Sequence, residues 1–238
     1  IEAEALGVGD AALNGDGRLE VRFQLWDVYG ERPQGDGIAV RAAPGEARRI
    51  AHRIADAVHL ALTGEPGWFT SRVAFVSESG PKDARVKRIS VMDWDGANYT
   101  PLTDGRHLAL TPRFSPQGDR LIYTSWETGE PRVILRDMAS GATEVLGRFP
   151  GMTFAPRFSP DGASVVFSLS EGGETDLWRL RLADRSLARL TNAPGIETAP
   201  SFSPDGAQIV FESDAGGSQQ LYVMAAAGGP ARGRHDVE

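Results

Sequence analysis

Short apolar runs separated by turn-forming residues fill the chain from residue 71 onward. Three of these runs, 120–124, 164–168 and 208–212, are rich in β-branched residues and apolar at successive positions. Runs of this kind are typical of strands that are covered on both faces. The pattern therefore predicts sheets that stack face to face.

One seven-residue motif stands before each of these runs. It reads Pro-Arg-Phe-Ser-Pro-Gln-Gly at 112–118, Pro-Arg-Phe-Ser-Pro-Asp-Gly at 156–162 and Pro-Ser-Phe-Ser-Pro-Asp-Gly at 200–206. Its second proline moves from 116 to 160 to 204, a period of 44 residues each time. A period of about 40 to 50 residues with several short strands per unit is typical of a β-propeller blade.

The physical chemistry of the motif fits a strand that runs into a tight turn. The second proline presets φ, and the glycine supplies the positive φ that the corner needs, so the motif predicts a β-turn between antiparallel strands. Asp161 and Asp205 invite comparison with a calcium site or paired catalytic carboxylates, but Gln117 in the first copy breaks that pattern. A turn-stabilising role explains all three positions.

Further strands complete each unit. Four strands are expected per repeat, and a weaker copy over 72–102 lacks its first strand. No strand is expected after Met224, so the strand that would close the ring is absent. These observations predict a mainly β protein with an open β-propeller of about four blades.

Residues 1–70 do not carry the repeat. Arg18–Asp27 alternates as a half-buried strand, and Asn14–Gly17 predicts a hairpin turn that pairs it with Val8–Leu13. A loop at Gly30–Gly37 then leads to a short strand at Ile38–Val40.

A helix follows over Glu46–Leu62, where apolar residues recur at four-residue spacing, and Thr63-Gly64 stops it. So few elements enclose only a small hydrophobic core, and we expect the first half of this unit to be missing. The predicted organisation is a partial small α/β domain over 1–64, a linker over 65–70 and propeller blades over 71–238.

Composition narrows the function classes. The chain is 41% hydrophobic and 24% charged, as a folded globular protein is. A net charge of −7 argues against a nucleic-acid surface, because no basic excess neutralises phosphates. The absence of cysteine removes disulfides, thiolate metal sites and thiol nucleophiles. No apolar run reaches the roughly 18 residues of a membrane span, and no signal peptide is present in this chain.

The motifs of catalysis are missing. No Gly-x-Ser-x-Gly elbow occurs, and Gly7-Val8-Gly9 lacks the third glycine of a dinucleotide loop. The four histidines have no ligand spacing, and His52 and His59 are placed at the solvated edge of the helix. The five tryptophans are interpreted as packing residues. We therefore predict no enzyme activity and no catalytic, cofactor-binding or metal-binding residues.

A resemblance emerges from the order of these features. The helix running into Leu62-Thr63-Gly64, the strand Arg72–Val76 and the Phe-Ser-Pro-Asp-Gly repeats together resemble the TolB family, the periplasmic component of the Tol-Pal envelope system. The family has six blades after a complete α/β domain, with the closing strand at the carboxyl end. The resemblance implies a fragment that lacks part of the amino-terminal domain and the last blades.

The resemblance also implies partners and a site. It implies a periplasmic scaffold that binds the Pal lipoprotein at the propeller mouth, with TolA reached through a segment absent here, and roles in protein import, cell division and outer-membrane integrity. The segments before each first strand, 108–111, 151–155 and 195–199, are expected to line this mouth. The positions that match the family's partner-contacting stretches are Met152, Ala155, Thr198 and Ala199.

Two alternatives stay open. Met152 stands where the family has a histidine and Ala199 where it has an acid, while Ala155 and Thr198 are explained equally well by blades that crowd the channel. The repeat is also shared with the propellers of prolyl-oligopeptidase-like serine peptidases, whose catalytic domain would lie outside this chain.

Overall fold

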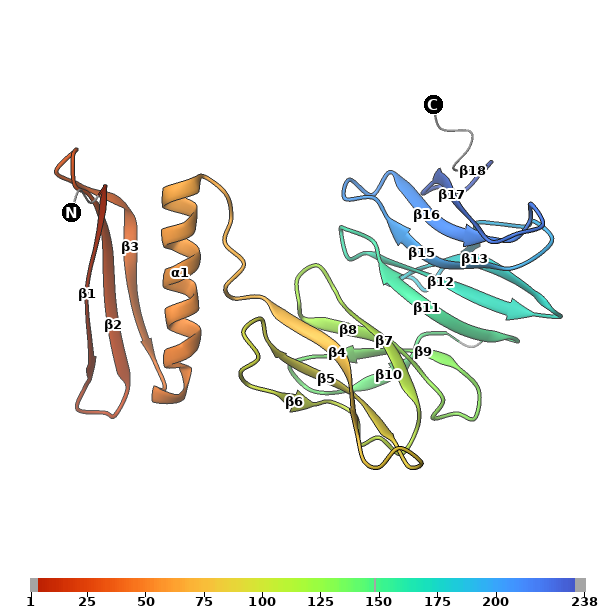
Figure 1. Ribbon diagram of the computed structural model, residues 1–238, viewed down its shortest axis with the longest axis horizontal. Coiled ribbons are helices and arrows are strands. Elements are labelled where there is room, and N and C mark those ends of the chain that lie inside the picture. Colours follow the sequence, from red (N-terminus) through yellow and green to blue (C-terminus); the bar gives the residue numbers. More distant parts are fainter. Residues whose placement is uncertain (1–3, 148, 234–238) are drawn as a thin grey trace. The chain divides into compact units, whose positions relative to one another are not determined.

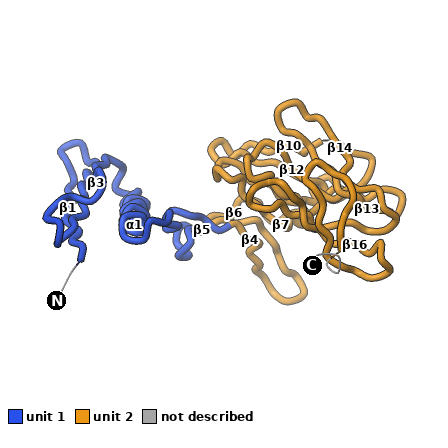
Figure 2. The backbone as a smooth tube through the Cα atoms, turned by 90° about the horizontal axis from the view of Figure 1, so that it is seen from above, with its two compact units in different colours: residues 1–73, 92–98 blue, residues 74–91, 99–238 orange. Residues whose placement is uncertain are grey.

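The computed structural model describes residues 4–147 and 149–233 and divides into two compact units. One unit comprises residues 1–73 and 92–98, and the other comprises residues 74–91 and 99–238 (Figure 2). The described residues include none of 234–238, so His235 lies outside them.

The first unit is a three-stranded antiparallel sheet with one long helix. The sheet has the order β1 (Ala5–Leu13), β2 (Leu19–Asp27), β3 (Arg32–Ala42), and a short 3-10 turn (Pro44–Glu46) leads into α1 (Ala47–Thr63). Figure 1 shows α1 lying along one face of this sheet, where it contacts β2 and β3. Among the described residues, no helix combines the length and the unbroken apolarity that a bilayer crossing needs.

The predicted hairpin and helix end are confirmed. The Arg18 amide donates to Asn14 Oδ1 at 2.9 Å, which fixes the turn between β1 and β2. Gly64 adopts φ +76°, and its amide donates to the Leu60 carbonyl at 2.9 Å. A left-handed glycine is the usual helix terminator, because it has no Cβ to oppose that conformation.

The prediction of a loop over Gly30–Gly37 is wrong for most of its length, because β3 already begins at Arg32. The register between β2 and β3 shifts between Phe23 and Leu25, and Gly35 and Gly37 take positive φ. The glycines therefore form an irregular part of the strand, which the turn-like composition conceals.

The prediction that His52 and His59 lie at the solvated edge of the helix is wrong. The chain after α1 folds back on the helix, where Asp56 accepts from the Phe69 and Thr70 amides at 2.7 and 3.1 Å. The His59 ring then packs on Trp68 at 4.7 Å, and His52 Nε2 lies 3.1 Å from Asp95 Oδ2. The helical pattern could not reveal partners that come from outside the helix.

The second unit contains four consecutive antiparallel sheets, which we call blades 1 to 4 (Figure 1). Blade 1 has three strands and starts within the first unit: β4 (Arg72–Ser79), β5 (Val86–Asp93) and β6 (Thr100–Pro101). Blade 2 is β7 (Ala109–Phe114), β8 (Arg120–Ser125), β9 (Arg132–Asp137) and β10 (Thr143–Val145). Blade 3 is β11 (Met152–Phe158), β12 (Ser164–Glu171), β13 (Glu174–Arg181) and β14 (Leu187–Arg189). Blade 4 is β15 (Glu197–Phe202), β16 (Gln208–Ser213), β17 (Gln220–Ala225) and β18 (Arg232–Gly233).

The fourth strand of blade 4 corrects the expectation that no strand follows Met224. β18 pairs with β17 through Tyr222↔Gly233 and Val223↔Arg232. Two residues are too few to show an alternating pattern, so the sequence contained no readable signal for this strand.

Side chains from neighbouring blades form the core. Ile122 and Val133 of blade 2 pack with Val165 and Phe167 of blade 3 in one cluster. Val166, between those two blade 3 residues, belongs instead to the cluster shared with blade 4. A third cluster joins blades 1 and 2 around Ile89 and Leu121. Each central strand therefore buries alternate side chains against two different neighbours, which explains its apolar residues at successive positions.

The repeated motif forms the expected turns. The amides of Gly118, Gly162 and Gly206 donate to the serine carbonyls three residues earlier at 2.8–2.9 Å. In blade 3, Asp161 Oδ1 accepts from the Ala163 amide at 2.9 Å and from Ser159 Oγ. In blade 2, Gln117 does not accept the hydrogen bond from the motif serine. Asp119 Oδ1 accepts it from Ser115 Oγ at 2.6 Å instead.

Replacing the turn aspartate should weaken the fold in a pH-dependent way. The Ser159 hydroxyl and the Ala163 amide hold the pKa of Asp161 below its ordinary value. A lowered carboxyl pKa contributes stability above the unfolded pKa of about 3.9, and this contribution is lost as the pH falls through the folded value. Asp161→Ala should therefore cost about 1 kcal/mol or less at neutral pH. The cost should shrink in thermal melts as the pH falls below the unfolded value of about 3.9.

The matched control is Gln117→Ala, at the same motif position without a carboxylate. It should leave the acid limb of the stability curve unchanged, whereas Asp119→Ala should flatten it. Equal effects of the Asp161 and Gln117 changes would contradict the assignment of the turn carboxylates.

Candidate functional site

The first strands of successive blades lie side by side. β11 contacts β7 on one side and β15 on the other. These strands therefore occupy the axial side of the blades, as the innermost strands of a propeller do. Met152 and Ala155 lie on β11, and Thr198 and Ala199 lie on β15. The structure thus brings all four predicted site residues to the two neighbouring axial strands of blades 3 and 4.

Each axial strand contains a left-handed bulge at the same position. Thr111, Ala155 and Ala199 have φ of +54°, +52° and +51°, and the pairing register shifts at each of them. A residue with a Cβ pays roughly 1–2 kcal/mol in this conformation. The strain persists because the surrounding blade dictates it, and strain of this kind gathers at functional sites.

An exposed apolar side chain lies three residues before each bulge. We call Leu108, Met152 and Ile196 the mouth residues; they are 40%, 42% and 43% exposed. Their separation is 44 residues, so each blade from 2 to 4 presents one of them. Of these three residues, only Met152 is among the site residues predicted from the sequence. The signal for the other two was present, because an apolar residue stands at a constant distance before each motif.

Thr198 differs from the other predicted residues. It is half-buried, and Ser168 Oγ donates to its Oγ1 at 3.3 Å across the interface between blades 3 and 4. Thr111 makes a related contact with Thr124 at 3.2 Å within blade 2. Met152 and Ala199 are exposed, and Ala155 is half-buried. Thr198 therefore contributes to blade packing as well as to the axial surface.

Two arginines follow the bulges. The Arg113 and Arg157 guanidinium groups donate to the carbonyls of Pro112 and Pro156 at 2.7 and 3.0 Å. Burial, and then the charge of Arg113, lowers the pKa of Arg157 to about 10, so Arg157 stays charged at neutral pH. Within residues 4–147 and 149–233, neither forms an ion pair with a carboxylate. The axial strands thus carry two uncompensated positive charges in an acidic chain, which favours anionic groups.

Glu197 is a buried acid on the axial strand β15 and is not among the site residues predicted from the sequence. Glu197 is 1% exposed, and its position in blade 4 corresponds to that of Ala109 in blade 2 and Thr153 in blade 3. Its Oε1 accepts from Ser213 Oγ at 3.1 Å, whereas Oε2 is buried without a hydrogen-bond partner among the described residues. Burial raises the pKa of Glu197. The hydroxyls of Ser213 and Thr191 oppose this rise, and the nearby carboxylates of Asp176 and Asp214 add to it. An acid where the other blades carry alanine and threonine was the readable signal.

The described residues contain no group of three histidine, aspartate or glutamate side chains arranged to hold a metal ion. The residues gathered on the axial strands are apolar, small or cationic, with one buried acid. Such a set can bind another molecule through shape, apolar contact and charge.

Comparison with known proteins places the chain in a family. A family model described as the TolB beta propeller domain matches residues 59–234. The chain belongs to the TolB β-propeller family. This confirms both the resemblance inferred from the sequence and the mainly β propeller fold.

Relatives agree with this TolB assignment. "Tol-Pal system protein TolB" of Cereibacter sphaeroides is 54% identical over 155 residues, which cover 65% of this chain and 35% of the relative. The protein of the same name from Dinoroseobacter shibae is 56% identical over 151 residues, which cover 63% and 34%. The crystal structure of TolB from Acinetobacter baumannii matches with a TM-score of 0.82 at 32% identity over 97% of this chain and 57% of that one. The chain spans about a third of the length of these curated TolB relatives.

The raised pKa of Glu197 predicts how Glu197→Gln changes stability with pH. A buried carboxyl whose folded pKa is raised destabilises the fold as the pH rises from the unfolded value of about 4.3 through the folded value. Glutamine does not titrate. The melting temperature of the variant relative to the parent chain should therefore rise between pH 4 and pH 7.

Glu212→Gln is the matched control, since Glu212 lies one residue before Ser213 and contacts Gln219 at 3.2 Å, outside this cluster. A difference between Glu197→Gln and the parent chain that stays constant with pH, or falls, would show that Glu197 is not held in an unfavourable charged state.

Proposed function

We propose that the chain is a non-enzymatic, periplasmic protein-binding scaffold of the Tol-Pal system that docks Pal on its axial surface. The contact surface comprises Met152, Ala155, Thr198 and Ala199, extended by Leu108 and Ile196. The observation that carries this proposal is the recurrence of one exposed apolar mouth residue per blade, three positions before a strained bulge.

Physical reasons favour a protein partner at this surface. Apolar side chains exposed at a constant place in three successive blades gain free energy when a partner covers them. The bulges fix the backbone before binding, so little conformational entropy is lost on docking. Arg113 and Arg157 add a positive field that favours an acidic segment of the partner.

The wider role follows from the same proposal. A scaffold that holds Pal, and that reaches TolA through a segment outside this chain, would support protein import, outer-membrane integrity and envelope constriction during cell division. Membership of the TolB family favours this role over a peptidase propeller. No specific feature of the described residues supports the alternative that the chain is the propeller of a serine peptidase.

Met152→Asp should weaken Pal binding at least tenfold, because a carboxylate in an apolar contact must be desolvated without a partner. The measurement is a calorimetric titration of the chain with the soluble domain of Pal. Leu187→Asp is the matched control, since Leu187 is 39% exposed on β14 of the same blade, away from the axial strands. Equal affinities for the two variants would move the interface elsewhere.

Ala155→Trp should abolish Pal binding without changing the circular dichroism or the melting temperature. Ala155 already has a Cβ at φ +52°, so a larger side chain adds bulk without new backbone strain. Ala155→Gly relieves the strain and should keep the affinity. A collapsed melt for the tryptophan variant would instead identify Ala155 as a packing residue between crowded blades.

The absence of enzyme activity is tested by labelling the purified chain with a fluorophosphonate probe for serine hydrolases. We expect no modified serine after digestion and mass spectrometry. A labelled serine, lost on heat denaturation, would establish a nucleophile and overturn the scaffold assignment.

A further inference from the structure

A cavity of about 460 Å³ opens between blades 3 and 4, next to the axial strand β15. Its walls include Leu190 and Thr191 from the end of blade 3, and Phe211, Ser213 and Tyr222 from blade 4. Glu197 also lines it and is its one charged residue. The size is that of a small-ligand or side-chain pocket.

The chemistry of the cavity is polarised. Its walls are mostly apolar, and the rings of Phe211 and Tyr222 stack at 5.9 Å with an angle of 26°. At the Glu197 end, the Ser213 hydroxyl donates to Oε1 at 3.1 Å, and the Thr191 hydroxyl is near enough to lower the pKa of the carboxyl. Oε2 is buried and accepts no hydrogen bond of normal geometry from the described residues. A buried acceptor left unpaired costs free energy that a ligand donor would recover.

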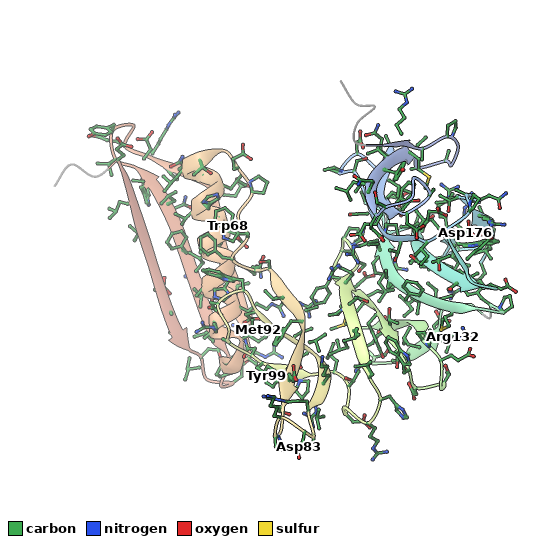
Figure 3. All side chains as sticks on the ribbon, turned by 45° about the vertical axis from the view of Figure 1, so that its right-hand side comes forward. Trp68, Asp83, Met92, Tyr99, Arg132 and Asp176 are labelled. Atoms are coloured by element: carbon green, nitrogen blue, oxygen red, sulfur yellow. The ribbon has the colours of Figure 1, made fainter. Side chains whose placement is uncertain are left out.

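The surrounding charges favour a cation. Asp176, labelled in Figure 3 on β13, is buried and pairs with Arg189 at 2.6 Å. Asp214 accepts from the Ile196 amide at 2.7 Å. Three acidic side chains therefore lie near the cavity, and one of them forms an ion pair with an arginine, so the local electrostatic potential is negative. Among the described residues, neither Glu197 nor Asp214 has an ion-pair partner, and of the two only Glu197 lines the cavity.

We propose that this cavity binds a primary alkylammonium group, the chemistry of a lysine side chain, with its nitrogen at Glu197 Oε2. The alkyl stem lies along Leu190 and Phe211, and the aromatic face of Tyr222 adds a cation–π contact. An ammonium fits better than a guanidinium, because Ser213 already occupies Oε1 and leaves no pair of oxygens for a bidentate contact.

This site is distinct from the mouth residues and does not depend on Pal as a partner. Glu197 is the neighbour of Ile196 in the chain, yet its side chain is buried where that of Ile196 is 43% exposed. A lysine-bearing segment or a free alkylamine satisfies the same chemistry, and the probes below distinguish these two sources.

The test is a titration of the chain, followed by NMR, with three probes. Nα-acetyl-lysine methylamide supplies stem and ammonium, the norleucine analogue supplies the stem alone, and butylammonium supplies a free amine. The lysine probe or butylammonium should bind at least tenfold more tightly than the norleucine analogue, and shifts should map to Phe211 and Tyr222. Binding of butylammonium without the lysine probe would identify a free amine as the source.

Glu197→Gln should remove the preference for the ammonium, because it keeps an oxygen for Ser213 and loses the charge. Glu212→Gln should retain that preference. Equal binding of the lysine and norleucine probes, no binding by either amine, or the same loss in both variants would overturn the proposal. The comparison of probes on the parent chain decides the matter even if Glu197→Gln does not fold.

Discussion

The structure of the second unit depends on burial at both faces of each central strand. β12 shows the constraint most clearly, since Val165 and Phe167 pack against blade 2 while Val166, between them, packs against blade 4. A strand that is buried on both faces cannot shift its pairing register by one residue without exchanging both sets of side-chain contacts. The blade before and the blade after must therefore present matching surfaces.

Because the interblade cores fix the backbone, the axial strands repeat their geometry even where their residues differ. The bulge recurs at Thr111, Ala155 and Ala199 although none of the three is glycine. The fold imposes this conformation on whatever residue stands there. Side-chain identity at the axial positions is then free to serve recognition, and the change from Ala109 to Thr153 to Glu197 at one buried position illustrates this freedom.

The sequence predicted those features that arise from local chemistry or from strict repetition. The turns at Gly118, Gly162 and Gly206 need proline and glycine at fixed places, and the central strands need apolar residues on both faces. Features that depend on distant contacts could not be predicted. His52 finds Asp95 only after the chain folds back, and the carboxylate of Asp119 replaces Gln117 from two positions away.

The charged residues of the candidate site differ from those of the turns in how they are stabilised. Asp119 and Asp161 are exposed acids that neighbouring hydroxyls and amides stabilise, so they serve the fold. Glu197 is a buried acid and Arg157 is a half-buried base, and neither has an ion-pair partner among the described residues. Selection for stability alone replaces such groups with apolar residues of similar volume, because burying an uncompensated charge costs several kcal/mol. Their presence on neighbouring axial strands therefore favours a partner that supplies the missing charges, an anion near Arg157 and a cation at Glu197.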